Sequence, residues 1–298
     1  MNAAFVRPVF RFAPSPNGRL HLGHAYSALL NEAMAAGVDG RFLLRIEDTD
    51  LTRSKREFEA AIIDDLVWLG LAFAAPRRQS EHIDEYARTL ASLDARGLIY
   101  PCFCTRGEIQ RASGGLRDPD GAPLHRGACR AMSNAEIEAR QSAGERAALR
   151  LDMTRALSRI GGALTWREYG EGAREALVEA DPAAWGDVIL RGKDRPANYH
   201  LAVVVDDAVQ AVSDVVRGRD LYHATSIHRL LQGLLGVEPP RYRHHRLVRD
   251  ASGARMSKSA HSQPLATLRE RGFTADQVRA ALGFGESRAT PPFVVTIS

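Results

Sequence analysis

Two histidines separated by leucine and glycine stand near the start of the chain, in His21-Leu-Gly-His24. They follow a turn cluster, Pro14-Ser-Pro-Asn-Gly18, and open an Ala- and Leu-rich stretch that predicts a helix over 22–37. A helix N-terminus offers free N–H groups and a partial positive charge, which suit a phosphate chain. Gly23 would let a base or ribose approach closely. Taken alone, the pattern also fits ordinary helix capping.

A second segment that could act on phosphate lies near the other end of the chain, in Arg255-Met-Ser-Lys258-Ser259. It follows a predicted turn, Asp250-Ala-Ser-Gly253, and holds one of only three lysines in the chain, the others being Lys55 and Lys193. Lysine commonly places a mobile point charge on a phosphate. Taken alone, the segment could equally be a solvated basic turn.

A third group contains metal-ligand side chains: Cys102, Cys104, His125 and Cys129. Cys-x-Cys places two thiolates on one side of a loop, and the later His-x₃-Cys pair supplies the other two corners of a tetrahedron. Because all three cysteines of the chain take part, we predict one structural Zn²⁺ with four protein ligands. Asp118 and Asp120 are alternative ligands if His125 points away.

The elements that must position these groups alternate at first between strand and helix. Apolar runs at 9–12 and 42–46 predict strands, and helices are predicted at 22–37 and 55–69. This order is typical of an α/β fold with a parallel sheet and crossover connections.

The pattern degrades from about Tyr100 to Arg150, which predicts an insertion. Strand signals resume at 187–190, and the apolar run 201–205 is interpreted as a buried strand that two aspartates turn into a hairpin with 209–212. A helix is predicted over 220–235. Thr274, with Gln277 three residues later, predicts the start of a last short helix.

Composition describes an ordinary globular chain of 298 residues, 45% hydrophobic and 26% charged, which excludes a disordered protein. No apolar run approaches the roughly 20 residues of a membrane span, and the N-terminus has no secretory signal. Three cysteines form no closed disulfide framework, so we expect a cytoplasmic protein without membrane contact. The net charge of +4 is compatible with nucleic-acid binding but does not demand it.

The histidine segment and the lysine segment, in this order, resemble the HIGH and KMSKS signatures of class I aminoacyl-tRNA synthetases. Within that class, nearly the whole chain is similar to the glutamate and glutamine branch. Four further segments carry this similarity: Arg11-Phe-Ala-Pro-Ser-Pro-Asn-Gly18, Arg45-Ile-Glu-Asp-Thr-Asp50, Asn198-Tyr199 and Val216-Arg-Gly-Arg-Asp220. The resemblance implies a Rossmann-type catalytic domain and ATP with Mg²⁺ as substrate.

The resemblance also implies site residues. For glutamate these are Arg11, Phe12, Ala13, Pro14, Ser15, Glu47, Tyr199 and Arg217. Guanidinium groups suit the two carboxylates of glutamate, and Glu47 matches the family's partner of the α-amino group. For ATP they are His21, Gly23, His24, Met256, Ser257 and Lys258, of which His21, His24 and Lys258 are the expected catalytic residues. Arg45 or Glu47 could instead form a structural salt bridge, and Asp48 and Asp50 are expected to cap the next helix rather than bind Mg²⁺.

The predicted organisation divides the chain into four segments: residues 1–98 and 187–240 as the two halves of the Rossmann domain, 99–186 as the zinc-containing insertion, and 241–298 as the lysine loop and a helical C-terminal region. About 40 residues follow Lys258, too few for an anticodon-binding domain with its own core. The chain therefore resembles the family of glutamyl-Q tRNA(Asp) synthetases. The family often has tyrosine at the position of His125, and imidazole is the more ordinary zinc ligand.

The resemblance implies tRNA-independent activation of L-glutamate and its transfer to the queuosine base at the wobble position of tRNA(Asp), by a monomer. Three alternatives stay open. One is a truncated synthetase that charges the tRNA 3′ end, and another is a non-catalytic paralogue that binds tRNA or glutamate. The third is a ligase that uses the adenylate on a small-molecule amine.

Lys258→Ala is expected to lower the rate of glutamyl-adenylate formation, because the ammonium would stabilise charge on the phosphates of ATP. The fold should change little, since the loop is predicted to be exposed. ATP–pyrophosphate exchange measures the rate, and an unchanged rate in the variant contradicts the assigned role.

Overall fold

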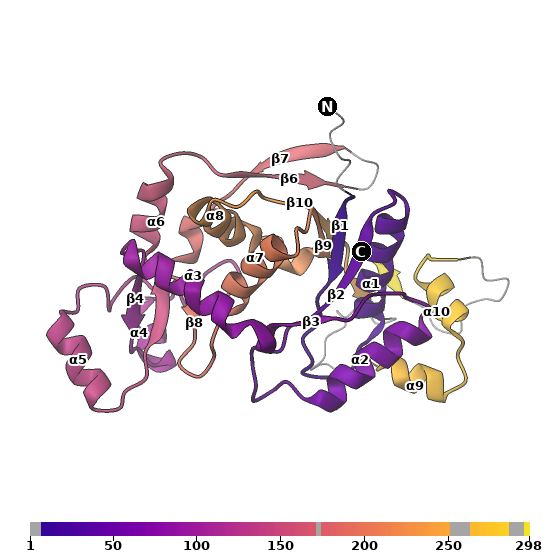
Figure 1. Cartoon of the computed structure of the whole chain (residues 1–298), viewed down its shortest axis with the longest axis horizontal. Coiled ribbons are helices and arrows are strands. Elements are labelled where there is room, and N and C mark those ends of the chain that lie inside the picture. Colours follow the sequence, from indigo (N-terminus) through magenta and orange to yellow (C-terminus); the bar gives the residue numbers. More distant parts are fainter. Residues whose placement is uncertain (1–6, 171–173, 251–262, 286–294) are drawn as a thin grey trace.

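A seven-stranded sheet forms the centre of the protein (Figure 1). The computed structural model describes residues 7–170, 174–250, 263–285 and 295–298. In spatial order the strands are β3 (Arg77–Arg78), β2 (Arg41–Ile46), β1 (Val9–Phe12), β9 (Asp214–Gly218), β10 (Arg241–His245), β6 (Thr165–Tyr169) and β7 (Glu175–Glu179). All neighbours are parallel except β6 and β7, which form an antiparallel pair at one edge. The predicted α/β fold with a parallel sheet is confirmed.

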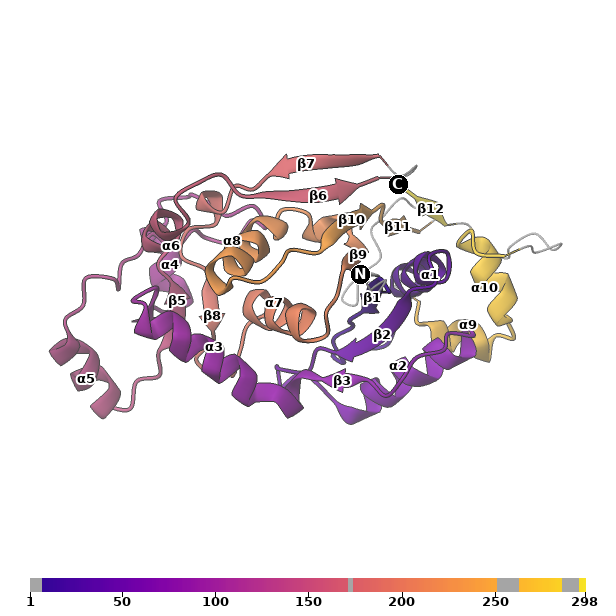
Figure 2. The ribbon, with the colours of Figure 1, turned by 45° about the horizontal axis from the view of Figure 1, so that its top comes forward.

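Helices at one end of the molecule pack around β1 and β2 (Figure 2). They are α1 (Leu22–Ala36), α2 (Arg56–Trp68), α9 (Leu265–Glu270) and α10 (Ala275–Ala281). A short antiparallel ladder of β11 (Val248–Arg249) and β12 (Thr296–Ile297) lies beside α1. The predicted helices over 22–37 and 55–69 are confirmed, as is the capping box of Thr274 and Gln277 at the start of α10.

The other end of the molecule holds a separate three-stranded antiparallel sheet, β4 (Ile99–Cys102), β5 (Ala148–Leu151) and β8 (Ile189–Arg191). Its helices are α3 (Ile83–Ala95), α4 (Arg106–Ala112), α5 (Asn134–Ser142) and α6 (Met153–Ile160). Short 3₁₀ turns lie at Gln79–His82, Ala183–Trp185 and Arg219–Leu221. The domain boundaries expected from the sequence stay a prediction, although β6 and β7, both within the expected insertion, belong to the main sheet.

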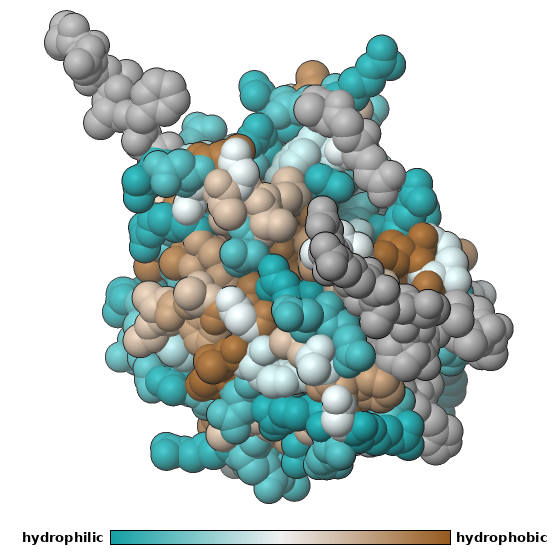
Figure 3. Space-filling view, turned by 90° about the vertical axis from the view of Figure 1, so that its right-hand side faces the viewer, coloured by the Kyte–Doolittle hydropathy of each residue, from teal (hydrophilic) through white to brown (hydrophobic). Residues whose placement is uncertain are grey.

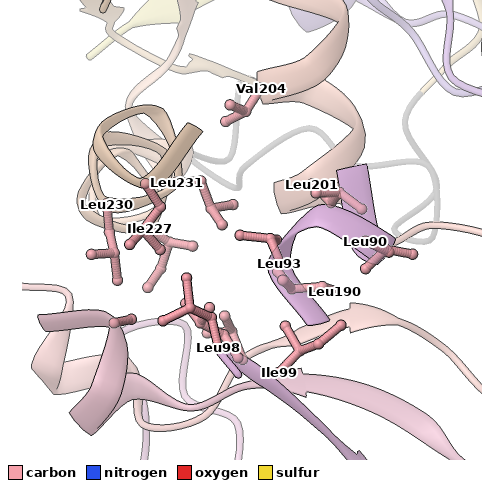
Figure 4. Close-up of a cluster of buried hydrophobic side chains, with 14 of the residues drawn as sticks. Leu90, Leu93, Leu98, Ile99, Leu190, Leu201, Val204, Ile227, Leu230 and Leu231 are labelled. Carbon is pink, nitrogen blue, oxygen red and sulfur yellow. The ribbon is translucent and has the colours of Figure 1, made fainter. Parts of the chain in front are cut away.

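Two helices join the ends of the molecule, α7 (Tyr199–Val209) and α8 (Thr225–Leu235). Their apolar faces meet α3 and the three-stranded sheet in one core, in which Leu93, Leu201 and Leu230 point toward one another (Figure 4). Burial of a leucine side chain contributes about 1.5–3 kcal/mol. This core fixes the position of α7, whose N-terminus and two aspartates belong to the site described below.

The interpretation of 201–205 as a strand is wrong, because these residues lie inside α7, and no hairpin with 209–212 forms. All seven residues from Leu201 to Asp207 are buried, and a helix buried on every side lacks the polar face that would reveal its period. The strand that follows is β9, which the sequence did not predict. The helix expected over 220–235 begins only at Thr225.

The described surface is mixed in polarity. On the face that lies at the right in Figure 1, hydrophobic residues stand in small groups between hydrophilic ones (Figure 3). Large apolar side chains such as Val67, at 60% exposure, reach the surface at a few positions, which is normal for a globular protein. Among the helices that the structure describes, none combines the length and the apolar character needed to span a bilayer.

Candidate active site

The two histidines of the first motif both cap α1 and face a cavity. His21 Nδ1 accepts a hydrogen bond from the Gly23 N–H at 3.1 Å, and His24 Nδ1 accepts one from the His21 N–H at 3.2 Å. A neutral imidazole that accepts at Nδ1 carries its proton on Nε2. A Cβ on residue 23 would lie 3.0 Å from the His21 ring, so glycine fits here best. Capping thus uses Nδ1 of each ring, and Nε2–H is the group of each ring that would donate to a phosphate.

A cavity of about 340 Å³ opens at the carboxyl ends of β1, β2, β9 and β10, next to the N-terminus of α1. In open α/β sheets, ligands bind at this edge. The cavity brings together nine of the residues expected from the sequence: Arg11, Phe12, Ala13, His21, Gly23, His24, Glu47, Tyr199 and Arg217.

The remaining expected residues lie elsewhere. Pro14 and Ser15 do not line the cavity, although the Pro14 carbonyl accepts the Glu47 N–H at 3.1 Å and so helps to position that residue. Met256, Ser257 and Lys258 lie outside the described residues.

Asp207 of α7 holds two arginines of the sheet. Its carboxylate accepts hydrogen bonds from Arg11 Nε at 3.1 Å and from Arg45 Nη1 at 2.8 Å. All three side chains are buried. Burial would raise the pKa of Asp207, but the two arginines lower it below its ordinary value. The carboxylate therefore remains ionised and fixes the Arg11 guanidinium at the wall of the cavity.

Glu47 is the carboxylate that faces the cavity from the end of β2. Burial raises its pKa to about 7, against the opposing influence of Arg45 and Arg11. Its Oε1 lies 3.8 Å from Arg45 Nη2, beyond hydrogen-bond distance. Arg45 donates its hydrogen bonds to Asp207 and Gln210 instead, so among the described residues Glu47 has Arg45 as an ion-pair neighbour but no cation within hydrogen-bond distance. A substrate ammonium could fill that role.

Arg217 has no carboxylate within 4.0 Å among the described residues, although only 5% of it is exposed. Its described partners are Thr225 Oγ1 at 2.8 Å, the Leu221 carbonyl at 3.1 Å, Tyr199 Oη at 3.1 Å, His244 Nε2 at 3.1 Å and His228 Nδ1 at 3.2 Å. Burial lowers the pKa of His244 to about 4, and burial followed by Arg217 places that of His228 well below its usual value. Arg217 is thus a buried cation in a neutral shell.

Sequence reasoning missed several residues of this site. Asp207 was assigned to a turn, and the histidines at 228 and 244 received no role. Asp220 and His245 line the cavity as well. A usable signal was present: Arg11 and Arg45 interrupt apolar runs that predict strands, and an arginine buried in such a strand needs a buried carboxylate.

Asp48 and Asp50 take other roles than the expected capping of α2, whose N-cap is Lys55 without a side-chain bond. Asp48 accepts hydrogen bonds from the backbone N–H and hydroxyl of Ser80 at 2.8 and 2.6 Å. Asp50 pairs with Arg195 at 2.6 Å. Neither lines the cavity.

The metal-ligand group is assembled beside β4. The ligand atoms of its members all lie within 4.8 Å of one another: Cys102, Cys104, His125 and Cys129. Cys102 Sγ lies 3.4 Å from His125 Nε2, and Cys104 Sγ lies 3.3 Å from Cys129 Sγ. These separations suit a tetrahedral ion of the size of Zn²⁺. Asp118 is used differently, since its Oδ1 accepts the N–H groups of Asp120 and Ala122.

A buried network orients His125. Its Nδ1 lies 3.3 Å from Tyr100 Oη, which donates a hydrogen bond to Asp187 at 2.5 Å. Arg130 Nε also donates to Asp187, at 2.7 Å. Gly186 has a φ of 57°, and a Cβ there would lie 2.6 Å from the His125 carbonyl oxygen. Partners of this kind set the tautomer of a metal-binding histidine and its ring orientation.

Comparisons with known proteins show which family the chain resembles. Residues 8–283 match the family described as tRNA synthetases class I (E and Q), catalytic domain. The chain is 42% identical over 92% of its length to a glutamyl-Q tRNA(Asp) synthetase of Rhodobacter capsulatus, covering 99% of that protein. It is 36% identical over 90% of its length to glutamate–tRNA ligase 2 of Syntrophus aciditrophicus, covering 55% of it.

A solved structure shows the same fold. A glutamate tRNA ligase from Elizabethkingia meningosepticum, in complex with its amino acid, aligns with a TM-score of 0.75 at 23% identity. The alignment covers 93% of this chain and 60% of that chain. At this level of identity, the likeness extends to the fold alone.

Purified protein is expected to contain about one Zn²⁺ per chain, because the cluster supplies four ligands and a closed site. His125→Ala should lower the zinc retained after dialysis against a chelator and should lower Tm. Asp118→Asn is the matched control and should retain the metal. Elemental analysis measures the content; far less than one zinc in the wild type would remove the site.

Proposed function

Because the chain belongs to the family of class I tRNA synthetases for glutamate and glutamine, we propose that it activates L-glutamate with ATP and transfers it to tRNA. It is accordingly an enzyme of the ligase type. Synthetases of this class use ATP with Mg²⁺, which neutralises phosphate charge during the reaction. We place the enzyme in the cytoplasm, where tRNA and ATP are available, and propose that it acts as a monomer.

The proposed preference for glutamate rests on Arg217, whose buried positive charge has no counter-ion among the described residues. A buried guanidinium without a counter-anion is unfavourable, and a ligand carboxylate that reaches it relieves that cost. Arg11 lines the same cavity but already shares Asp207. An anionic side chain therefore gains more at Arg217 than a neutral carboxamide does, which favours glutamate over glutamine.

Glu47 would bind the α-ammonium of glutamate. Since burial holds its pKa near 7, an arriving cation stabilises the ionised form and is bound in return. The Tyr199 hydroxyl, fixed by Arg217 at 3.1 Å, lies on the same wall. Glu47, Tyr199 and Arg217 can thus bind one glutamate through its α-ammonium group and its side-chain carboxylate.

Activation joins the α-carboxylate oxygen to the α-phosphorus of ATP while the bond to pyrophosphate breaks. His21 and His24 would donate Nε2–H hydrogen bonds to the phosphate oxygens at the N-terminus of α1, together with Lys258. No enzyme nucleophile is needed, because the contributions are positioning and electrostatic stabilisation.

Transfer joins an acceptor hydroxyl oxygen to the glutamyl carbonyl carbon, and AMP leaves with the hydroxyl proton passing to its phosphate. The name of the Rhodobacter relative supports the queuosine base of tRNA(Asp) as the acceptor, through a hydroxyl of its cyclopentene ring. The name of the Syntrophus relative supports the tRNA 3′ end as the second candidate. The Cys-His cluster would hold Zn²⁺ as a structural ion.

Arg217→Gln should raise KM for glutamate roughly 10- to 100-fold, because a hydrogen bond to a charged group contributes about 1.5–3 kcal/mol. It should also reduce the preference for glutamate over glutamine in ATP–pyrophosphate exchange. Arg167→Gln, at a side chain 66% exposed, is the matched control. A folded Arg217→Gln protein with unchanged KM would contradict the assignment.

Labelled glutamate and ATP, supplied with bulk tRNA from queuosine-proficient and queuosine-deficient cells, test the acceptor. Label only on the proficient tRNA is expected, because only that tRNA offers the cyclopentene hydroxyls. Equal label on both establishes charging of the 3′ end instead. Adenylate formation without any transfer would point to a small-molecule acceptor, and its absence to a non-catalytic protein.

A further inference from the structure

A second cavity, of about 660 Å³, lies between the metal-ligand group and the N-terminus of α7. It is distinct from the glutamate cavity, and the two share no lining residue. The two cavities are nevertheless lined by consecutive residues in one short segment of the chain, 198–200. Tyr199 lines the first cavity, while its neighbours Asn198 and His200 line the second. In Figures 1 and 2, α7 accordingly lies between the two ends of the molecule.

A relay of three side chains connects the cavities. Arg217 Nη1 lies 3.2 Å from His228 Nδ1, and His228 Nε2 lies 3.2 Å from His200 Nδ1. Arginine can only donate, so His228 Nδ1 must accept and its Nε2 must carry the proton. His200 Nδ1 then accepts in turn, which places the proton of His200 on Nε2. That N–H has no partner among the described residues, in a side chain that lines the second cavity.

Other polar groups of this cavity also lack partners. Trp185 is 5% exposed, and its Nε1–H has no acceptor in the described part of the chain. Asn198 stands at the N-cap of α7 but makes no capping bond with its side chain. The rings of Trp185 and His200 lie 5.4 Å apart and nearly perpendicular. The Trp185 Nε1–H is itself covered, so the cavity offers aromatic surface together with the Nε2–H donor of His200.

Asp120 supplies an acceptor at the rim. It lies in a turn that Asp118 fastens through the N–H groups of residues 120 and 122. Asp120 is exposed, so a ligand at the rim can reach its carboxylate.

We propose that the second cavity receives the acceptor nucleobase, a guanine-type ring, while the base's hydroxyl-bearing substituent reaches toward the adenylate. Proteins read bases that leave their stack by aromatic contact and by hydrogen bonds to the base edge. A guanine-type edge combines a carbonyl acceptor with N–H donors. The carbonyl suits the Nε2–H of His200, and the donors suit Asp120. A volume of about 660 Å³ lies within the range of small-ligand sites. The inference rests on the proposed transfer to queuosine.

The test separates activation from transfer. The double variant Asp120→Asn with Asn198→Ala should raise KM for queuosine-containing tRNA about tenfold, as expected for lost hydrogen bonds to a base edge. ATP–pyrophosphate exchange with glutamate needs no acceptor and should change less than about twofold. His200→Phe, which keeps a ring but loses the Nε2–H donor, should likewise impair transfer more than exchange. Glu138→Gln, on the exposed face of α5, is the control for both assays.

Calorimetry with the free nucleosides queuosine, guanosine and adenosine gives a second readout. Queuosine and guanosine should bind the wild type more tightly than adenosine, and the double variant should lose this preference. Wild-type protein that transfers glutamate to queuosine-containing tRNA while the variants transfer equally well would overturn the cavity assignment and leave the proposed function intact. Wild-type protein that fails to transfer would overturn the proposed function, and absence of nucleoside binding would overturn the cavity independently.

Discussion

The carboxylate of Asp207 is the contact on which the active site depends, since it neutralises two buried arginines from neighbouring strands. Arg11 leaves β1 and Arg45 leaves β2, and both meet the same side chain of α7. Removing one partner of such a buried pair typically costs about 3–5 kcal/mol, because the other charge is left uncompensated. The pairing therefore binds α7 to the sheet and sets the position of every residue that α7 presents to the two cavities.

Charge is distributed unevenly around this contact, and the imbalance gives the site its selectivity. Asp207 satisfies Arg11 and Arg45, whereas Arg217 receives only neutral partners. Because His228 and His244 are uncharged, they do not repel the Arg217 guanidinium. They also leave it without a counter-anion in the described part of the chain. Glu47 has the complementary deficit, a carboxylate with a pKa near 7. Glutamate has an α-ammonium group for Glu47 and a side-chain carboxylate for Arg217, so one ligand supplies the partner that each residue lacks.

The sequence predicted the residues of the cavity better than it predicted the elements that carry them. Motif residues such as His21 and Glu47 lie at the ends of strands or starts of helices, where turn residues mark the position. Residues 201–205 gave no such mark, because uniform burial hides the helical period. Partners of buried charges were also missed, since Asp207 and His228 are distant in sequence from the groups they serve. Their positions depend on tertiary packing, which no local pattern encodes.

The metal-ligand group and the second cavity share side chains. His125 contributes its ring to the group of four ligands and also lines the cavity. Asp187 is shared in the same way, since it accepts from Tyr100 behind His125 and lines the cavity as well. A closed tetrahedral site resists distortion, so an ion there would fix the wall of the second cavity to which His125 belongs. The ion would thus support the insertion's side of a base-sized space beside α7, which gives a structural role to a metal centre outside the glutamate cavity.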